Sequence, residues 1–328
     1  MDTFKALRIY ADDQVEARLE DLSVDDLNDG EVVIKTAWSC VNYKDALAVT
    51  GAGKILRTSP LVGGIDVSGT VIESADSRFN AGDEVLVTSA GLSETRDGGY
   101  AEYARLQADQ VIPVPAGFSP RDVMALGTAG FTAALAVHRM EQNGQSPDMG
   151  AIAVSGATGG VGSVAIDLLA SRGYEVHALS SKADAVDYLK SLGAAEVLNP
   201  RDIEMGTRPM ERATLGGAVD NLGGDVLSWF TRSTKYGGNV ASIGLAASHK
   251  LETTVMPFIL RGVNLLGINA VDTPRSVREE VWARLASDLK PRHLDKIVTG
   301  EVTLDELQAC LQDWIDGKVT GRKLVRIG

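Results

Sequence analysis

Short apolar runs broken by Gly, Asp and Pro dominate the first third of the chain. Apolar and polar residues alternate in these runs from Phe4 to Val114, and a period of two is typical of half-buried β-strands. We expect strands at 6–9, 31–35, 67–72 and 84–87, with turn sequences at 80–83 and 97–99. This part of the chain predicts a β-rich barrel or sandwich.

After Ser119 the pattern changes to apolar strands that alternate with helical stretches. We expect strands at 151–155, 175–179, 218–220, 239–243 and 263–268, and helices at 121–143, 161–172, 183–192 and 225–234. Such alternation predicts a doubly wound parallel sheet with right-handed crossovers. Two helices at 274–289 and 304–315 and a last strand at 323–327 complete an α/β fold.

Composition changes this picture in three ways. A chain of 328 residues that is 44% hydrophobic is long enough for two packed cores. A net charge of −12 disfavours nucleic acid as a partner, because binding to phosphates relies on Lys and Arg. No apolar run approaches the ~20 residues that span a bilayer, and the first residues lack a secretory pattern, so we expect a cytoplasmic protein without a membrane partner.

A turn of small residues follows the strand expected at 151–155. Ala157, Gly159 and Gly162 match the dinucleotide fingerprint, with Ala at its first glycine. In that geometry Gly159 lets the backbone approach a pyrophosphate, and Gly162 lets helix and strand pack closely. The predicted cofactor contacts here are Ala157, Thr158, Gly159, Gly160, Val161 and Gly162. The alternative is a plain structural turn.

The end of the next strand distinguishes the two nicotinamide cofactors. An acidic residue there binds the ribose hydroxyls of NAD and repels a 2′-phosphate, but this chain has Ser180, Ser181 and Lys182. Two hydroxyls and an ammonium group suit a phosphate, so NADPH is the expected cofactor. The alternative is that Lys182 is a solvated residue at the start of the next helix, where Asp184 lowers the local potential.

Several separated sequences resemble the medium-chain dehydrogenase/reductase superfamily over essentially the whole chain. They are the glycine turn and the segments 64–71, 82–85, 99–103 and 127–134; the segments 42–47, 256–262 and 321–325 look like the bacterial quinone oxidoreductase branch that includes acrylyl-CoA reductase. The resemblance implies a chaperonin-10-like catalytic domain at 1–122 and 270–328. It also implies a Rossmann NADPH-binding domain at 123–269, with the cofactor in the cleft between the domains.

Zinc enzymes of this superfamily carry a ligand cysteine within the segment that here reads 41–45, and a histidine at the position of Ile65. Both ligands are absent, and Cys40 and Cys310 alone cannot form a structural zinc site. We expect both thiols to be buried and reduced, and no metal to be bound. Hydride transfer to an electron-poor acceptor, such as a quinone or a conjugated alkene, suits such a site.

The resemblance brings the segment 42–45 close to the nicotinamide. Tyr43 is expected to contact the cofactor and to donate a hydrogen bond or proton, Asn42 to hold the substrate carbonyl or cofactor amide, and Asp45 to orient its neighbours. The alternative is a polar turn that closes the barrel, with Lys44 solvated. Arg322 is expected to bind a substrate carbonyl or anion, or else to form a surface ion pair.

The resemblance suggests further contacts at or after strand ends, where this fold binds dinucleotides. They are Asn221, Leu245, Ile259 and Asn269, although Leu245 and Ile259 can also be read as core. Asp66 and His138 are expected to be structural. The strand at 263–268 is either the edge that joins two Rossmann sheets in a homodimer or an ordinary edge.

The leading hypothesis is an NADPH-dependent reductase of a small activated alkene, with hydride transfer to the β-carbon of acrylyl-CoA or a similar enoyl thioester. NADPH:quinone reduction is the alternative, and no residue separates the two acceptors. A CoA ester needs a basic rim, for which Lys54, Arg57, Arg96 and Lys323 are candidates. A cofactor-binding protein with a structural or RNA-binding role is a hypothesis of another class, disfavoured by the net charge.

Overall fold

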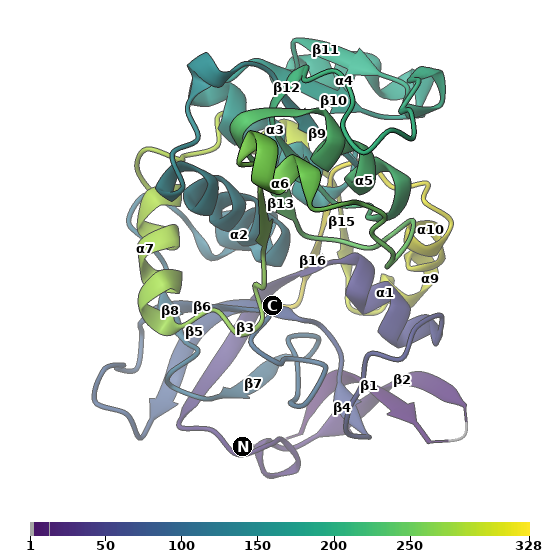
Figure 1. Cartoon of the computed structure of the whole chain (residues 1–328). Helices are drawn as coiled ribbons and strands as arrows, with labels where there is room; N and C mark the ends of the chain where they lie inside the picture. Colours follow the sequence, from purple (N-terminus) through teal and green to yellow (C-terminus); the bar gives the residue numbers. More distant parts are fainter. Residues whose placement is uncertain (1–2, 13) are drawn as a thin grey trace. The chain divides into compact units, whose positions relative to one another are not determined.

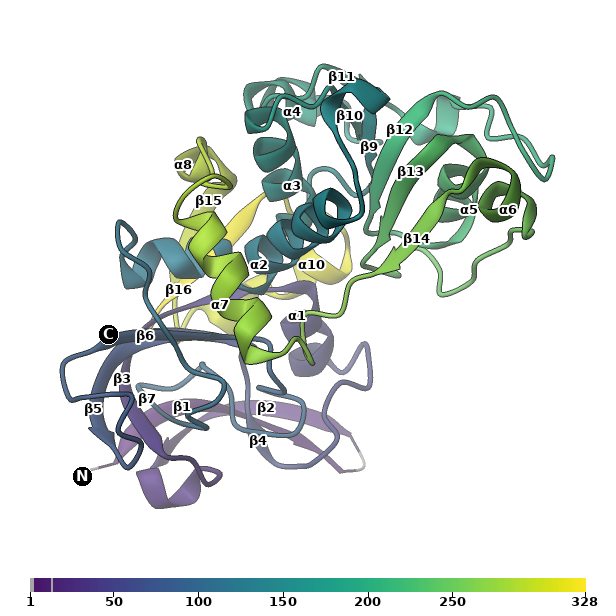
Figure 2. The same ribbon diagram turned by 60° about the vertical axis from the view of Figure 1, so that its left-hand side comes forward.

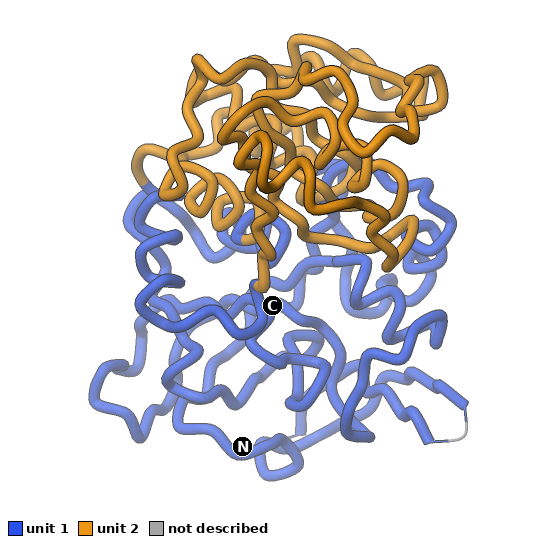
Figure 3. Tube along the Cα trace, in the orientation of Figure 1, with its two compact units in different colours: residues 1–131, 270–286, 298–328 blue, residues 132–269, 287–297 orange. Residues whose placement is uncertain are grey.

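The chain folds into two compact units, which Figure 3 colours separately. The computed structural model describes residues 3–12 and 14–328. Unit 1 holds the residues up to Phe131 together with Ala270–Ala286 and Val298–Gly328, and unit 2 holds Thr132–Asn269 and Ser287–Ile297. The predicted Rossmann domain, 123–269, starts earlier than unit 2 and lacks its second segment.

Unit 1 is built mainly of two β-sheets (Figure 1). The smaller has the order β2-β1-β4, with β1 at Phe4–Ala11, β2 at Val15–Leu22 and β4 at Leu61–Val62. The larger has the order β15-β16-β3-β5-β6-β8, with β7 paired to β3. Its strands are β3 (Val32–Val41), β5 (Asp66–Ser74), β6 (Glu84–Thr88), β7 (Tyr103–Leu106), β8 (Ile112–Pro113), β15 (Val298–Thr303) and β16 (Arg322–Arg326).

The alternating runs form these strands because every second side chain reaches a common core. Val67 and Val71 of β5 pack with Val85 and Val87 of β6 and with Ile34 of β3 in one buried cluster. The β-rich architecture expected for this part of the chain is therefore confirmed. Five strands of unit 1 were not predicted. They are β2, whose residues are largely exposed, the short strands β4, β7 and β8, and β15, which pairs in parallel with β16.

Short helices complete unit 1. They are α1 (Tyr43–Thr50), α7 (Arg275–Leu285), α9 (Leu307–Cys310) and α10 (Gln312–Ile315), with a 3-10 turn at Val24–Asp26. The helix predicted at 304–315 is wrong in detail, because Thr303 ends β15 and the rest forms two four-residue helices. The helix predicted at 274–289 ends at Leu285.

Helix α2, at Pro120–Gln142, contains a kink at Gly127, whose φ of 54° and ψ of −157° are not helical. The first segment of unit 1 ends at Phe131, which lies within this helix. Among the described residues, α2 is the one helix long and apolar enough to cross a membrane. Its most apolar window, however, is 89% buried inside the protein, as expected for a core helix.

Unit 2 is a parallel sheet with helices around it (Figure 2). The strand order is β11-β10-β9-β12-β13-β14, and all five pairings are parallel. The strands are β9 (Ile152–Val154), β10 (Val176–Leu179), β11 (Glu196–Leu198), β12 (Leu215–Asp220), β13 (Thr234–Ser242) and β14 (Asn264–Gly267). The helices are α3 (Gly160–Ser171), α4 (Val186–Ser191), α5 (Gly224–Ser233), α6 (Met256–Arg261) and α8 (Leu294–Ile297). Short 3-10 turns lie at Pro147–Met149, Ala183–Ala185 and Pro200–Asp202.

The predicted doubly wound sheet is confirmed. Its central strand β9 is completely buried, which explains why the sequence there is a continuous apolar run rather than an alternating one. Strand β14, predicted at 263–268, does lie at the edge of the sheet. Because all the strands are parallel, their carboxyl ends share one edge, and that edge is where this fold binds ligands.

Candidate functional site

The glycine turn joins β9 to α3 in unit 2. Gly156 has a φ of 57°, which side-chain-bearing residues rarely adopt, and Gly159 is the N-cap residue of α3. A Cβ atom on Gly162 would lie 2.4 Å from the carbonyl oxygen of Gly156 and 2.8 Å from the Cα of Ala157. Only glycine at position 162 therefore lets the start of α3 pack against the turn.

The first turn of α3 offers a site for an anion. The backbone N–H groups of Gly160, Val161 and Gly162 have no acceptor within the helix, because an α-helix leaves its first donors unpaired. These groups form the positive end of the helix dipole, which attracts phosphate. The geometry thus suits the pyrophosphate of a dinucleotide.

A buried polar network supports the turn from the end of β12. The Ser155 hydroxyl donates to Asp220 Oδ1 over 2.7 Å, and the side-chain nitrogen of Asn221 donates to the Ser155 carbonyl oxygen over 2.7 Å. Burial raises the pKa of Asp220, while the Ser155 hydroxyl and the Gly223 N–H oppose that shift. The buried Asn221 Oδ1 has no hydrogen-bond partner in the described chain. This unmatched acceptor fits a donor on a bound cofactor, such as a ribose hydroxyl.

The carboxyl end of β10 carries the residues predicted to bind the 2′-phosphate. The Ser180 N–H donates to the Leu198 carbonyl of β11 over 3.0 Å, and the Ser180 hydroxyl oxygen accepts from the Lys182 N–H over 3.1 Å. Partial burial lowers the pKa of Lys182, and the neighbouring Asp184 opposes that shift. Ser181 is exposed, so its hydroxyl is accessible to a ligand.

The remaining predicted cofactor contacts lie further along unit 2. Leu245, after β13, is 67% exposed and Ile259, in α6, is 71% exposed. The alternative that they belong to the core is therefore wrong, because both apolar side chains face solvent. Asn269, after β14, is also exposed. Their contacts with the cofactor stay predictions.

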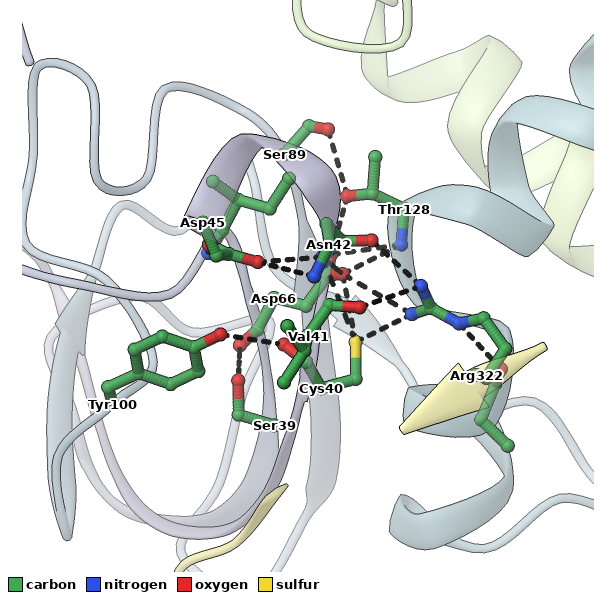
Figure 4. Close-up of polar contacts among 12 residues, drawn as sticks. Ser39, Cys40, Val41, Asn42, Asp45, Asp66, Ser89, Tyr100, Thr128 and Arg322 are labelled. Carbon is green, nitrogen blue, oxygen red and sulfur yellow. Dashed lines mark hydrogen bonds and ion pairs between the residues drawn. The ribbon is translucent and has the colours of Figure 1, made fainter. Parts of the chain in front are cut away.

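A second group of polar residues lies in unit 1, where α1 begins (Figure 4). We call Cys40, Asn42, Asp45, Asp66, Thr128 and Arg322 the Asn42 cluster. The amide nitrogen of Asn42 donates to Asp45 Oδ2 over 3.0 Å and to Asp66 Oδ2 over 2.8 Å, and its oxygen accepts from Arg322 Nη1 over 2.9 Å. The Asn42 amide is thus fully engaged within the protein, and this favours a positioning role over contact with the substrate.

Asp45 is completely buried at the third residue of α1. Its carboxylate accepts from the backbone N–H of Asn42 over 2.8 Å and from that of Ile65 over 2.9 Å. Burial raises the pKa of Asp45 to about 7, and the nearby charge of Asp66 adds to the shift. In this position Asp45 ties the start of α1 to the residue that precedes β5.

Asp66 is also completely buried and accepts several hydrogen bonds. The Thr128 N–H donates to its Oδ2 over 2.9 Å, and the Cys40 thiol donates to the same oxygen over 3.0 Å. A Cβ atom on Gly127 would lie 2.5 Å from Arg322 Nη2 and 2.6 Å from Cys40 Sγ, so the kink in α2 depends on glycine. The sequence did not predict Thr128 as a member of the cluster, although the segment 127–134 resembles the medium-chain dehydrogenase/reductase superfamily.

Arg322, the first residue of β16, is only 2% exposed. Its Nη1 donates to the Val41 carbonyl over 3.1 Å, its Nη2 to Cys40 Sγ over 2.8 Å and its Nε to the Ala125 carbonyl over 3.2 Å. The alternative of a surface ion pair is therefore wrong. The guanidinium is an internal cation, 4.0 Å from Asp66 Oδ2.

Tyr43 differs from its neighbours because it is exposed. As the first residue of α1 it exposes 43% of its surface, and its hydroxyl has no hydrogen-bond partner among residues 3–12 and 14–328. Tyr100, by contrast, is completely buried and donates to the Cys40 carbonyl over 3.1 Å. Lys44 is not simply solvated, because its ammonium group lies 2.6 Å from Glu94.

The described part of the chain contains no group of three or more His, Cys, Asp or Glu side chains placed to hold a metal ion. Both cysteines are free thiols; Cys40 is buried, but the expectation of burial is wrong for Cys310, which is partly exposed. His138 is buried in α2.

Arg96 reaches the Asp29 carbonyl over 3.3 Å, and Lys323 lies over the Trp314 ring. These two candidates for a basic rim thus have contacts within unit 1.

Comparison with known families matches both parts of the chain. Residues 28–116 match the alcohol dehydrogenase GroES-like domain, and residues 160–287 match the family described as zinc-binding dehydrogenase. Asn42 and Ile65, which stand where zinc enzymes of the superfamily carry ligands, lie in the first of these segments, so the chain lacks those two ligands.

Three bacterial proteins are similar over nearly their whole length. YhfP of Bacillus subtilis, named as a quinone oxidoreductase, is 46% identical over 99% of both chains, and its structure with NAD bound has a TM-score of 0.96. The acrylyl-CoA reductase AcuI of Ruegeria pomeroyi is 42% identical over 99% of both chains. The YhdH oxidoreductase of Salmonella enterica, solved in complex with NADP, is 44% identical over 99% of this chain and 100% of its own, with a TM-score of 0.95.

These matches agree with the features found in each unit, namely a dinucleotide-binding turn in one and a β-rich domain in the other. The fold class and the family resemblance expected from the sequence are both confirmed. The chain belongs to the medium-chain dehydrogenase/reductase superfamily of oxidoreductases, in the zinc-free branch of the bacterial quinone oxidoreductases and acrylyl-CoA reductases.

Proposed function

We propose that this protein is an NADPH-dependent reductase of a small activated alkene, with acrylyl-CoA or a similar enoyl thioester as its substrate. The observation that carries the proposal is the glycine turn of α3 next to a β10 end that has hydroxyls and an ammonium group in place of an acidic residue. Two relatives support it by name: an acrylyl-CoA reductase and an oxidoreductase solved with NADP.

The cofactor is proposed to bind along the carboxyl edge of the sheet in unit 2. The N–H groups of Gly160 to Gly162 would hold the pyrophosphate, and Asn221 Oδ1 would accept from a ribose hydroxyl. Ser180, Ser181 and Lys182 would hold the 2′-phosphate. When bound, NADPH supplies the hydride for the reaction.

Tyr43 is the proposed proton donor. Reduction of an enoyl thioester adds a hydride at the β-carbon, places negative charge on the thioester oxygen, and then needs a proton at the α-carbon. Tyr43 is exposed, and its hydroxyl has no hydrogen-bond partner among the described residues, so it can donate a hydrogen bond to that oxygen or the proton itself. The Asn42 cluster would position Tyr43, because Asn42 and Asp45 hold the residues around it.

The residues at the position of the zinc ligands also favour this chemistry. The Asn42 amide and the Arg322 guanidinium share the buried space around Asp66. A guanidinium remains charged in proteins and repels a metal cation. Activation of an alcohol as a metal alkoxide is thus disfavoured by the side chains present, whereas an acceptor that is already polarised needs no such activation.

Quinone reduction is the second candidate, favoured by the name and 46% identity of the YhfP relative. The deciding experiment compares NADPH consumption with acrylyl-CoA, crotonyl-CoA and a simple benzoquinone, with NADH as the control cofactor. We expect kcat/KM for acrylyl-CoA to exceed that for the quinone at least ~100-fold, which is about 2.7 kcal/mol of transition-state discrimination. The opposite ratio would favour the quinone as the substrate. RNA binding in a gel shift without any NADPH oxidation would refute the proposal that the protein is an enzyme.

We further propose a cytoplasmic homodimer joined through β14. Edge strands present unpaired backbone groups, and two copies of one edge can pair around a two-fold axis. Apolar side chains are exposed on and near this edge: Leu265 of β14 is 37% exposed, Ile259 of α6 is 71% exposed, and Tyr236 of β13 is 82% exposed. The two free thiols agree with a reducing compartment.

A further inference from the structure

A cavity lies in unit 2 at the edge of the sheet where β12 and β13 begin. Its volume is about 560 Å³, within the ~300–1,000 Å³ of small-molecule sites. Thr214 and Ser233 line it, and they directly precede Leu215 and Thr234, which are partners in the parallel register of the two strands. The proposed cofactor site lies at the carboxyl ends of the same strands. The cavity is therefore at the opposite edge of the sheet.

Ser233, the last residue of α5, has a buried hydroxyl without a hydrogen-bond partner in the described chain. Other hydroxyl groups of this helix donate to carbonyl oxygens of the helix itself. Ser228 donates to the Gly224 carbonyl over 2.8 Å, and Thr231 donates to the Ser228 carbonyl over 2.8 Å. A serine in a helix has this local option, but Ser233 does not use it. Its hydroxyl can therefore pair with a polar group of a ligand in the cavity.

The loop that forms the other wall of the cavity is fixed on the end of α5. The Thr214 N–H donates to the Ser233 carbonyl over 2.9 Å. The Glu211 N–H donates to the Arg232 carbonyl over 3.0 Å. The Arg261 guanidinium of α6 holds both sides, because it donates to the Arg232 carbonyl over 2.9 Å and to the Glu211 carbonyl over 2.7 Å. A wall that is already fixed lowers the entropy that is lost when a ligand binds.

Four charged side chains line the cavity, and their charges sum to zero. Two of them neutralise each other, because Arg208 Nη2 lies 2.7 Å from Glu211 Oε2, and this contact lowers the pKa of Glu211. Glu204 and Arg212 are exposed, and neither has a hydrogen-bond or ion-pair partner among the residues that the structure describes. A free carboxylate and a free guanidinium at one cavity match a ligand that carries an ammonium group and a carboxylate.

The charges also disfavour simpler ligands. A purely anionic ligand is repelled by the net charge of −12 on the chain, and a purely cationic one would leave Arg212 without a partner. Trp229 also lines the cavity and offers aromatic surface to an ammonium group. The hydroxyl groups of Thr207 and Thr214, which have no hydrogen-bond partner in the described chain either, suit a polar ligand side chain.

We propose that this cavity binds a free α-amino acid with a polar side chain. Arg212 pairs with the carboxylate of the ligand and Glu204 with its ammonium group, while the Ser233 hydroxyl forms a hydrogen bond to the ligand. The site is separate from the proposed cofactor site and takes part in no step of the proposed reduction.

The test uses the full-length protein and calorimetry, with L-glutamine as the probe. Two analogues each lack one charged group: glutaramate has no α-ammonium group, and 4-aminobutanamide has no α-carboxylate. We expect L-glutamine to bind at least ~10-fold more tightly than either analogue, because each analogue loses a charge-assisted hydrogen bond. Saturating NADPH should change the affinity for L-glutamine less than ~2-fold, since the proposed cofactor site lies at the other edge of the sheet.

A pair of serine variants locates the site on α5. Ser233→Ala should weaken L-glutamine binding at least ~3-fold. It should not lower the unfolding temperature, because the lost hydroxyl has no partner in the described chain. Ser228→Ala is the matched control, since its hydroxyl donates to the Gly224 carbonyl and accepts from the Glu252 N–H over 2.9 Å. This control should lower the unfolding temperature and leave L-glutamine binding unchanged.

A pair of arginine variants tests recognition of the carboxylate. Arg212→Ala should remove the preference for L-glutamine over 4-aminobutanamide, because that preference comes from the guanidinium. Arg139→Ala, which alters an exposed arginine of α2 in the same unit, should keep the preference. A preference that survives in Arg212→Ala would overturn the role of Arg212.

Three further results would overturn the proposed site. They are no binding of L-glutamine, equal binding of L-glutamine and its two analogues, and an equal loss of affinity in Ser233→Ala and Ser228→Ala. Competition between NADPH and L-glutamine would overturn the location of the site at the edge where β12 and β13 begin. None of these measurements depends on turnover, so they leave the proposed reductase activity to its own test.

Discussion

Arg322 Nη1 donates a hydrogen bond to Asn42 Oδ1 over 2.9 Å, and this contact joins the last strand of the chain to the start of α1. The two residues lie 280 positions apart in the sequence. The contact joins an early and a late segment of the chain within unit 1, and it fixes the residue that precedes Tyr43.

Replacement of Arg322 by methionine should destabilise the protein by ~3–5 kcal/mol, because the buried Asp66 carboxylate would lose its internal cation. Chemical denaturation measures the change. The control is Arg326→Met, which alters an exposed arginine of the same strand and should cost under ~0.5 kcal/mol. Equal stability of the two variants would contradict the role of Arg322 in unit 1.

Asp45 should make stability depend on pH. Burial and the charge of Asp66 raise its pKa from 3.8 to about 7, so the folded protein holds a proton there that the unfolded chain has already released. The proton on Asp45 stabilises the fold fully below the pKa that Asp45 has in the unfolded chain. This stabilisation is lost as pH rises through about 7, and the loss amounts to at most about 4 kcal/mol. Unfolding of Asp45→Asn and of the unaltered protein at pH 5 and pH 8 checks this. The free energy of unfolding of the variant should rise relative to the unaltered protein at the higher pH, and parallel pH profiles would refute the shift.

Tyr43→Phe should lower kcat ~10²–10⁴-fold if the hydroxyl acts as the proton donor. Stability should change little, because Tyr43 is exposed and its hydroxyl has no partner in the described chain. Turnover of acrylyl-CoA and thermal unfolding are measured on the same samples. Tyr236→Phe, also exposed, is the control and should keep full activity. A Tyr43→Phe enzyme that keeps its kcat would exclude the tyrosine as donor.

The two glycines of the α3 turn should respond differently to alanine. A Cβ atom on Gly162 meets backbone at 2.4 Å, whereas one on Gly159 comes within 3.3 Å of a single oxygen and needs no unusual φ. Gly162→Ala should therefore lower both the unfolding temperature and the affinity for NADPH. Gly159→Ala should spare the unfolding temperature and weaken NADPH binding, because the methyl group would stand where the pyrophosphate approaches the backbone. Loss of stability in both variants, or in neither, would count against this division of roles.

The proposed dimer makes a prediction about β14. Leu265→Asp should convert the dimer into a monomer, since it places a charge on the edge strand. Light scattering after gel filtration gives the mass of the species. Leu251→Asp is the matched control, because Leu251 has the same 37% exposure but lies outside the strands. A monomeric unaltered protein would refute the proposed dimer. A dimeric Leu265→Asp variant would show that the dimer interface does not involve β14.

Local sequence patterns were enough to predict the parallel sheet, the β-rich part and the dinucleotide turn. Periodicity is a local property, and the turn needs a strand, small residues and a helix within one short segment, such as 151–162. The same patterns missed β2 and β15, and they did not reveal that the helix predicted at 304–315 is broken, because pairing partners and packing far along the chain decide those elements.

The chemistry of the Asn42 cluster was decided by tertiary structure alone. From the sequence, Arg322 suited a surface ion pair as well as a substrate contact, and Asn42 suited a substrate carbonyl. Folding buries the guanidinium, engages the amide completely and raises the pKa of Asp45, because it brings residues from α1, β5, α2 and β16 together in the protein interior. The sequence by itself determined the fold and the cofactor-binding turn of this protein, whereas burial and partner choice, which depend on contacts distant in the chain, determined which polar side chains remain available for a substrate.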